Sequence, residues 1–285
     1  MAINGNGNTI TNQGKMTGVS DGLLISGNNN IVTTSGGEIS GKMVSASVKA
    51  AATDNAKSGS KITTTSTGIS IAGGNNQVTT ESGSAIVAKD NGILINSGAN
   101  NVTNGGSITA TGSSISYGIQ YNSGRSGTIT NTGTITTTGK GAGDASVYAH
   151  GGAVTINNSG TMDSSVFGVY VTTGHTLNNL AGGSITANTA VQLNGNNNTL
   201  ANAGAILGDT DGVTISGSGN TLTSQGKITG GTNAVLINSG SKNNTITLNT
   251  GTEISGSITD DNNSASANNN LILDGRVRWA AASAA

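Results

Sequence analysis

The chain contains no cysteine and no proline, and it is poor in aromatic (2%) and charged (9%) residues. The absence of cysteine excludes disulfides and thiolate metal sites. The formal net charge of −1 gives no reason to expect nucleic acid or an anionic membrane surface as a partner. Segments that are disordered because of their composition usually carry high net charge or abundant proline, and this chain has neither. We therefore expect an ordered protein with a thin apolar core.

Two further absences concern membranes and export. No apolar run approaches the roughly 20 residues that a membrane-spanning helix needs. The first residues, MAINGNGNTI, include neither the basic nor the apolar segment of a signal peptide. If the protein is exported, we expect its secretion signal to lie outside this sequence.

Glycine is abundant, with 46 residues, and it recurs with asparagine, serine and threonine in a repeating pattern. One aliphatic residue of a Gly-x-aliphatic motif marks each repeat, and these residues follow one another at intervals of 21 to 27 residues, with a mean near 24. The pattern indicates eleven repeat units. The marking residues are Met16, Ile39, Ile62, Ile86, Ile108, Ile135, Met162, Ile185, Ile206, Ile228 and Ile254.

Each unit contains three short segments in which aliphatic residues alternate with serine or threonine, the period of a strand buried on one face. In DGVTISGSGNTLTSQGKITGG (residues 211–231) they are GVTI, NTLTS and GKIT. Such short strands, joined by turns too short for crossover helices, predict an all-β protein. We expect a right-handed parallel β-helix of about eleven coils with three strands per coil. Glycine and asparagine suit corners with positive φ, and stacked corner asparagines would form amide ladders.

Two regions depart from the repeat. Residues 41–62 lose the glycine and asparagine punctuation and look weakly helical around residues 49–56, yet the normal interval predicts a degenerate coil. Two intervals of 27 residues between Ile108 and Met162 predict longer loops. We expect one domain over residues 1–275, followed by a disordered tail or cloning remnant at 276–285.

The last coils carry a resemblance to a known family. The stretch NNTITLNTGTEISGSITDDNNSASANNNLILDG (residues 243–275) resembles the C-terminal coils of passenger domains of type V bacterial autotransporters. The resemblance extends in architecture over residues 3–275. It implies a secretion signal upstream, an outer-membrane translocator barrel downstream, and a location at the bacterial cell surface or in the medium. Members of this family are most often adhesins or self-associating aggregation factors, and less often proteases or lipases.

Candidate catalytic groups are few. The GVSDG motif around Ser20 matches Gly-x-Ser-x-Gly, but no helix follows it, as a nucleophile elbow requires. His150 and Asp144 could join a serine in a relay, and His150, His175 and Asp163 could hold a metal. A corner position explains Ser20 better, and solvated loops explain the two histidines better. We therefore predict no catalytic residue, no metal and no cofactor.

Paired carboxylates occur twice: Asp209 with Asp211, and Asp260 with Asp261. The i, i+2 pair would share one face of a strand, as the acid–base groups of β-helical glycoside hydrolases and lyases do. No lysine or arginine lies between Gly141 and Gly226 to assist the first pair. Acidic turn residues are the better interpretation. A polysaccharide-degrading enzyme is therefore the alternative function and not the leading one.

The bulky residues gather in one stretch. Five of the six aromatic residues, both histidines and one arginine fall within or beside residues 117–175, where we expect the longer loops. Large amphipathic side chains on a surface of threonine and serine are typical of binding hot spots. We expect Tyr121 and Tyr170 to point outward. The candidate binding residues are Tyr117, Tyr121, Arg125, Tyr148, His150, Phe167, Tyr170 and His175.

We therefore expect a non-catalytic cell-surface passenger that acts as an adhesin or as a self-associating aggregation or biofilm factor through its elongated polar faces. Its partners would be other passengers, or a host surface component, matrix protein or glycan. Membrane contact would come only through the translocator barrel. A third hypothesis, ice binding, needs Thr-x-Thr in strict register on one face. KITTT and TITTT in the third segment favour it, but other coils carry serine, alanine or asparagine there.

Overall fold

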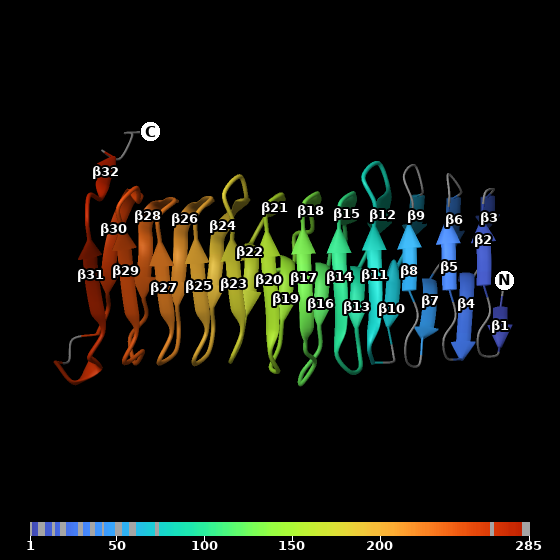
Figure 1. Ribbon diagram of the computed structural model, residues 1–285, viewed down its shortest axis with the longest axis horizontal. Helices are drawn as coiled ribbons and strands as arrows, with labels where there is room; N and C mark the ends of the chain where they lie inside the picture. The colour runs from blue at the N-terminus through green and yellow to red at the C-terminus, as the bar shows by residue number, and fades with distance from the viewer. Residues whose placement is uncertain are drawn as a thin grey trace.

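The computed structural model describes residues 61–71, 74–262 and 265–280, and of the chain before Lys61 only the backbone of strands β1 to β8. The described chain forms a parallel β-solenoid of about 9 turns with about 24 residues per turn. Figure 1 shows the coils stacked along the long axis of the molecule, with the two chain ends at opposite ends of the rod. The predicted all-β parallel β-helix with this repeat length is confirmed.

The second segment of each coil contributes to a sheet that faces the viewer in Figure 1, here called the front sheet. All its neighbouring strands pair in parallel, and each strand pairs with its counterpart in the next coil. Its 12 strands are β2 (Thr9–Asn12), β5 (Ile31–Thr34), β8 (Thr53–Ala56), β11 (Asn76–Thr80), β14 (Asn100–Asn104), β17 (Gly127–Asn131), β20 (Val154–Asn158), β23 (Thr176–Asn179), β25 (Thr199–Asn202), β27 (Thr221–Ser224), β29 (Thr245–Asn249) and β31 (Asn270–Asp274).

The other segments form the back sheet, which has 17 strands. Its third-segment strands are β3 (Lys15–Thr17), β6 (Glu38–Gly41), β9 (Lys61–Thr64), β12 (Ala85–Ala88), β15 (Ser107–Ala110), β18 (Thr134–Thr137) and β21 (Thr161–Ser164). Its first-segment strands are β10 (Ile69–Ile71), β13 (Asn91–Ile95), β16 (Tyr117–Tyr121), β19 (Ala145–Ala149) and β22 (Phe167–Val171).

Towards the C-terminus the third segment of one coil and the first segment of the next become one bent strand. These strands are β24 (Ser184–Leu193), β26 (Ala205–Ile215), β28 (Lys227–Ile237) and β30 (Glu253–Asp260). The short β32 (Arg278–Ala280) completes the back sheet. A separate sheet of 3 strands holds β1 (Ala2–Asn4), β4 (Asp21–Gly27) and β7 (Met43–Val48), and η1 (Ala265–Ala267) is a 3-10 helix. No helix in the described part of the chain is long and apolar enough to cross a membrane.

The alternating pattern places the core as expected. The aliphatic residues of the Gly-x-aliphatic motif, from Ile62 to Ile254, are at most 4% exposed. They stand opposite one another in register from coil to coil, as Ile108 does between Ile86 and Ile135. One apolar column therefore runs along the inside of the rod. The serine and threonine residues that alternate with these aliphatic residues along each strand face outward.

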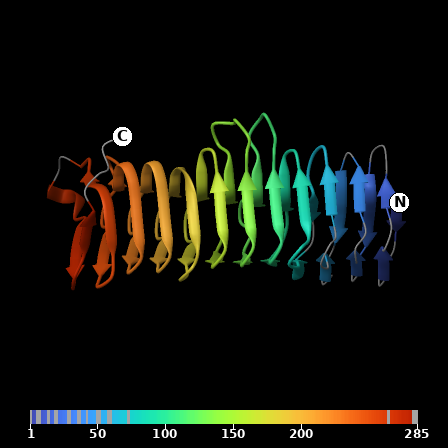
Figure 2. The same cartoon turned by 90° about the horizontal axis from the view of Figure 1, so that it is seen from above.

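The regions that depart from the repeat also form parts of the solenoid. Thr53–Ala56, expected to be weakly helical, is strand β8 instead, because β5 and β11 offer it parallel backbone partners on both sides. This pairing supports the interpretation as a degenerate coil; residues 49–52 lie outside the described chain. Arg278–Ala280, expected in the tail, forms β32 and pairs with Glu253–Ser255 of β30. The longer loops are confirmed at residues 111–116 and 138–144, and Figure 2 shows them projecting from the rod.

Buried asparagine side chains, each on the last residue of a front strand, form the predicted amide ladder. Nδ2 of Asn104 donates to Oδ1 of Asn131 at 2.7 Å, and the chain of bonds continues through Asn158 and Asn179 to Asn202 at 2.8 to 2.9 Å. Each Nδ2 also donates to a backbone carbonyl of the next coil, as Asn131 does to Thr161 at 3.2 Å. All five side chains are buried. Both amide hydrogens of each are therefore used between coils, and the ladder holds the coils in register.

A second set of amides lies at the first corner of the front sheet. Asn198, Asn220 and Asn244 each accept, through Oδ1, from the backbone N–H of the residue one coil earlier, at 2.8 to 2.9 Å. In the same column Gly127 has a φ of 137°, a region that side chains avoid. A Cβ at this position would collide with the backbone oxygen of Asn100. Glycine is therefore required at position 127, where no asparagine continues the column.

We predict that Asn158→Ala destabilises the protein strongly. The change leaves a buried Nδ2 hydrogen of Asn131 and the Oδ1 of Asn179 without partners, which costs about 2 kcal/mol or more. Asn157→Ala is the matched control, because Asn157 lies in the same strand but faces outward, so its loss costs less than about 1 kcal/mol. Equilibrium urea unfolding followed by circular dichroism compares the two. Equal losses in the free energy of unfolding would show that the buried ladder has no special role.

Candidate functional site

Four aromatic rings contact one another on the back sheet across three neighbouring coils. We call Tyr117, Tyr148, Phe167 and Tyr170 the aromatic cluster. The rings of Tyr117 and Tyr148 stack with centroids 4.7 Å apart and planes inclined by 19°. Tyr148 lies 5.3 Å from Tyr170, and Phe167 meets Tyr170 edge-on at 5.1 Å. All four side chains are half-buried, so the cluster is a surface feature and not part of the core.

Because the tyrosines stack on one another, their ring faces are largely covered. A ligand would meet ring edges and phenol hydroxyls. Burial, with the neighbouring Tyr148, Asp144 and Tyr170, raises the pKa of Tyr117 to about 12. Burial also raises the pKa of Tyr148 and that of Tyr170. The three hydroxyls therefore stay protonated at neutral pH and can donate hydrogen bonds as well as accept them.

The two long loops flank the cluster. Loop 111–116 leads into β16 and loop 138–144 leads into β19, so they enter the strands that carry Tyr117 and Tyr148. Buried Asp144 joins them: its Oδ1 accepts from the backbone N–H of Ser116 at 2.7 Å, and its Oδ2 accepts from that of Gly141 at 3.0 Å. Ile115, near the end of the first loop, is 52% exposed. Asp144 therefore holds the two loops together next to the strands that carry Tyr117 and Tyr148.

This geometry argues against the His–Asp–Ser relay. Asp144 precedes the first residue of β19 and His150 follows the last one. The two are six residues apart along an extended strand, which corresponds to about 20 Å. Asp144 acts in the loops, through Ser116 and Gly141. Ser20 lies outside the described residues.

Tyr121 was expected to point outward, and this prediction is wrong. Its side chain is 0% exposed, and its hydroxyl donates to the backbone oxygen of Asn100 at 2.6 Å. Tyr121 follows inward-facing Ile119 by two residues, and the period of a strand keeps it on the same side. The next coil has Ala149 opposite it, which leaves room for the ring. Tyr121 is therefore a core residue, whereas Tyr170, between inward-facing Val169 and Val171, points outward as predicted.

His175 was expected in a solvated loop, and this is also wrong. It is 2% exposed and lies in the corner column of amides, immediately before Asn198. Its Nδ1 accepts from the backbone N–H of Val154 at 3.2 Å, so it takes the role that asparagine Oδ1 has in later coils. Its Nε2 is buried without a partner. Burial, and then the nearby His150, lower the pKa of His175 to about 4.

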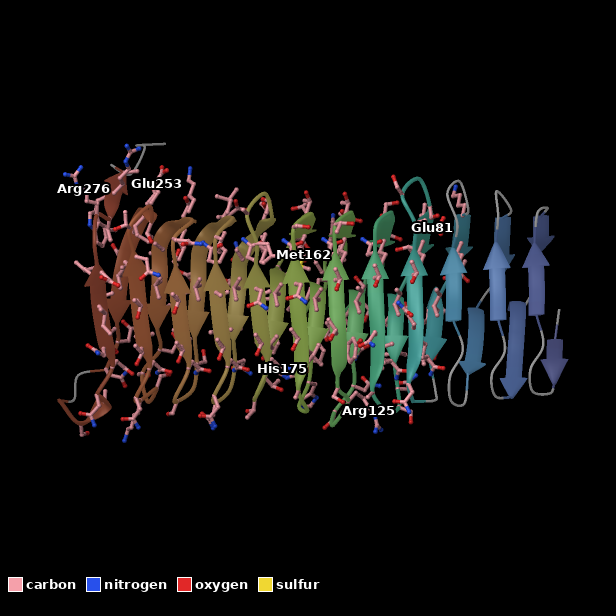
Figure 3. The ribbon with its side chains drawn as sticks, in the orientation of Figure 1. Glu81, Arg125, Met162, His175, Glu253 and Arg276 are labelled. Carbon is pink, nitrogen blue, oxygen red and sulfur yellow. The ribbon has the colours of Figure 1, made fainter. Side chains whose placement is uncertain are left out.

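The remaining predicted site residues lie at the edge of the cluster or below it. His150 is exposed, and its ring centroid is 6.0 Å from that of Tyr148. Arg125 lies in the turn after β16, and Figure 3 shows it at the same lower edge of the rod as His175. The Nε of Arg125 is buried without a hydrogen-bond partner. Of the eight predicted residues, the structure thus brings Tyr117, Tyr148, Phe167, Tyr170 and His150 together.

The acidic pairs are not arranged around a common cleft. Asp209 and Asp211 lie in β26, where pairing with β28 is interrupted between Gly208 and Asp211, and Asp211 accepts from Asn233 at 2.8 Å. Burial alone would raise the pKa of Asp260, but hydrogen bonds from Asn269 and Asn262 lower it. Among the described residues, no group of three or more histidine, cysteine, aspartate or glutamate side chains could hold a metal ion.

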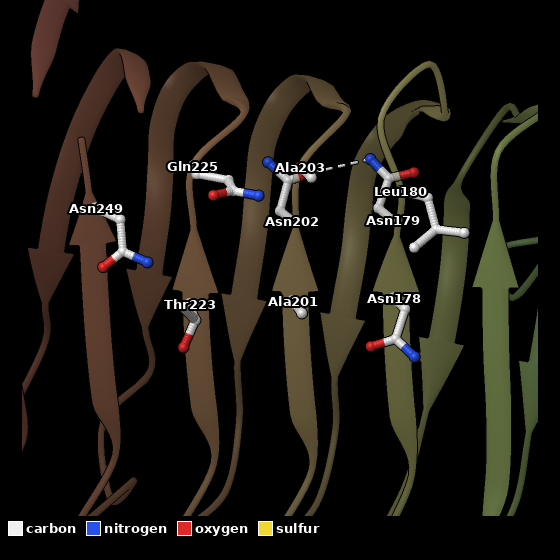
Figure 4. Close-up of a pocket in the computed structure, with 9 residues that line it drawn as sticks. All are labelled: Asn178, Asn179, Leu180, Ala201, Asn202, Ala203, Thr223, Gln225 and Asn249. Atoms are coloured by element: carbon white, nitrogen blue, oxygen red, sulfur yellow. Dashed lines mark hydrogen bonds between the residues drawn. The ribbon is translucent and has the colours of Figure 1, made fainter. Parts of the chain in front are cut away.

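A surface pocket of about 300 Å³ on the front sheet was not foreseen from the sequence (Figure 4). Ala201 stands there between the longer side chains Asn178 and Thr223, so the surface is hollowed at that coil. Leu180, at the rim, is 45% exposed. The signal in the sequence was a lone alanine in an outward row of threonine and asparagine. The other lining residues are Asn179, Asn202, Ala203, Gln225 and Asn249.

We predict that His175 makes stability depend on pH between about 4 and 6.5. The unfolded histidine binds a proton below about pH 6.5, but the folded one does so only below about 4, so the free energy of unfolding falls as the pH falls through this window. The expected loss is on the order of 3 kcal/mol. His175→Asn should remove this loss, because asparagine accepts the same backbone hydrogen bond in later coils.

Urea unfolding of both proteins at pH 7 and pH 4.5 measures the difference. The acidic residues that they share contribute equally and cancel in the comparison. Identical pH dependence in the two proteins would contradict the assignment.

Comparison with known proteins adds no relative from which a role could be transferred. No known protein family, no curated protein and no solved structure matches this chain.

Proposed function

We propose that the chain is the passenger domain of a type V bacterial autotransporter, exported through the periplasm and outer membrane and displayed at the cell surface or released. Its solenoid is right-handed and has eleven coils in this proposal. The stretch at residues 243–275 supports it, because the residues that carry the resemblance form the last coils, in strands β29, β30 and β31. The parallel β-solenoid is compatible with such a passenger but is not unique to it.

The proposed activity is non-catalytic: adhesion to a surface component, or self-association with other passengers in aggregation or biofilm formation. The aromatic cluster is the observation that carries the adhesive part. Four of the chain's six aromatic residues contact one another on the outside of a rod whose outward strand positions are mostly threonine, serine and asparagine. Tyrosine provides contact area with little loss of side-chain entropy, which is why binding surfaces use it.

The chemistry of the cluster favours a polar partner with many hydroxyl or amide groups, such as a glycan or a matrix protein. Ring edges offer apolar contact, and three protonated phenol hydroxyls offer hydrogen bonds. The amide of Asn194 donates to the hydroxyl of Tyr170 and extends the polar border to the next coil. Nucleic acid is not a proposed partner, because the formal net charge of −1 provides no general attraction for phosphate. In this proposal the membrane is reached only through a translocator barrel outside this sequence.

We predict that Tyr148→Ala with Tyr170→Ala weakens binding to the partner at least about tenfold, since such anchors are commonly worth more than 1.4 kcal/mol. The control is Gln120→Ala, because Gln120 occupies the same outward row one coil before Tyr148 and is half-buried like the tyrosines. Glycan arrays and immobilised matrix proteins identify the partner, and titration gives the affinities. The fold should persist in both variants. Undiminished binding by the tyrosine variant would overturn the assignment of the cluster.

If the passengers self-associate, we predict that the sedimentation coefficient of the purified chain increases reversibly with protein concentration. Hydrogen bonds between polar faces are worth about 1 kcal/mol each, so contacts repeated over many coils add up. A strict elongated monomer over the whole concentration range would remove self-association from the proposal and leave adhesion.

A further inference from the structure

The outer surface of the front sheet carries a column of threonines in register. The six strands β17, β20, β23, β25, β27 and β29 follow one another without a register shift. One outward position is threonine in all six. We call these residues the threonine column; they are Thr128, Thr155, Thr176, Thr199, Thr221 and Thr245. With strands about 4.8 Å apart, the column is about 24 Å long.

A second outward row lies two residues further along each strand, about 6.6 Å away. Thr130, Thr223 and Thr247 occupy it opposite three members of the column, so that β17, β27 and β29 each present Thr-x-Thr. Asn157, Asn178 and Ala201 fill the other three places, and the amide of Asn178 donates to Oδ1 of Asn157 at 2.8 Å. The side chains therefore form a two-dimensional array with two fixed repeat distances, and the array lies on the second segment of the coils, where the sequence had not suggested it.

Two further properties of the array bear on what it can bind. In both rows, from β11 to β29, no position is charged, whereas the back sheet places Lys61, Asp163 and the pair Lys227–Glu253 outward. Among the described residues, the Oγ1 atoms of the threonine column make no hydrogen bond to a protein atom. The hydroxyls are therefore left to water, and no charged group nearby imposes its own hydration shell.

From this arrangement we infer that the outer face of the front sheet binds ice. Each threonine presents a hydroxyl and a methyl group at a fixed point, at separations comparable with those between oxygen atoms on the faces of an ice crystal. A single such contact is weak in water, because liquid water competes equally well. A rigid array gains its affinity from many contacts whose ordering is already complete before binding. Rigidity here comes from the buried amide ladder beneath the same strands.

A second copy of the chain is the competing occupant of this face, because an uncharged surface of repeated polar side chains could also pair with itself. Ice binding and pairing make different demands. Ice binding needs the repeat distances of the array, and it acts on a single chain at any protein concentration. Pairing depends on concentration and leaves the growth of ice unchanged.

The test uses the whole purified chain, with Thr199→Lys in the middle of the column. The control is Thr134→Lys, an equally exposed strand threonine on the back sheet. Circular dichroism and thermal unfolding establish that both variants fold. The measurements are the gap between the melting and growth temperatures of a single ice crystal, and the growth of grains in polycrystalline ice held just below melting.

We expect the unaltered chain and Thr134→Lys to open this gap and to stop grain growth, and Thr199→Lys to behave as buffer does. Ice growth in the presence of the unaltered chain that equals growth in buffer would overturn the inference. So would equal activity of the two variants. If, in addition, Thr199→Lys abolished self-association in sedimentation velocity, the face would belong to a second copy and not to ice.

Discussion

Hydrogen bonds between buried asparagine side chains are the interaction on which the rest of this rod depends. An inward-facing amide in a thin apolar core is costly unless both its hydrogens and its oxygen are bonded. From Asn104 to Asn179 each amide is satisfied only when the next coil is in register, because its partners are the next asparagine and a carbonyl beyond it. A slip of one residue would break all these bonds at once. The ladder therefore selects one stacking arrangement that the aliphatic column alone would specify less sharply.

Because the coils are held in fixed register, the side chains on the outside of the rod form regular rows. Side chains that face water inherit the spacing of the coils, so that any residue type repeated in the sequence becomes a line on the surface. Tyr148 and Tyr170 come into contact for this reason, and the threonine column is straight for the same reason. Departures from regularity occur where loops lengthen beside Tyr117 and where Gly127, Val154 and His175 replace asparagine in the corner column. The aromatic cluster and the buried histidine both fall in that middle part of the rod.

Period and alternation were enough to predict the parallel solenoid, its repeat length, the apolar column and the amide ladder, because each depends on residues that recur in every coil. Features that occur once were harder to predict. The expected alternation of aromatic and aliphatic residues holds for Tyr170 but fails for Tyr121, because Tyr121 follows Ile119 by two residues and so lies on the same side of the strand. The role of His175 could not be seen, since only the coil stacking shows that it stands in a column of asparagines. The aromatic cluster was located by composition, but its stacking needed the register of three coils.

Hydrogen exchange of the side-chain amides, measured by nuclear magnetic resonance, tests the central role of the ladder most directly. Asn131, Asn158 and Asn179 are predicted to retain their Nδ2 protons in heavy water as long as the neighbouring strand backbone does, because both hydrogens are bonded and buried. Asn157 faces outward in the same strand as Asn158 and should lose its Nδ2 protons at once. Equally fast loss from Asn157 and from the three ladder residues would contradict the account, because the coils would then be held in register by something other than the buried amides.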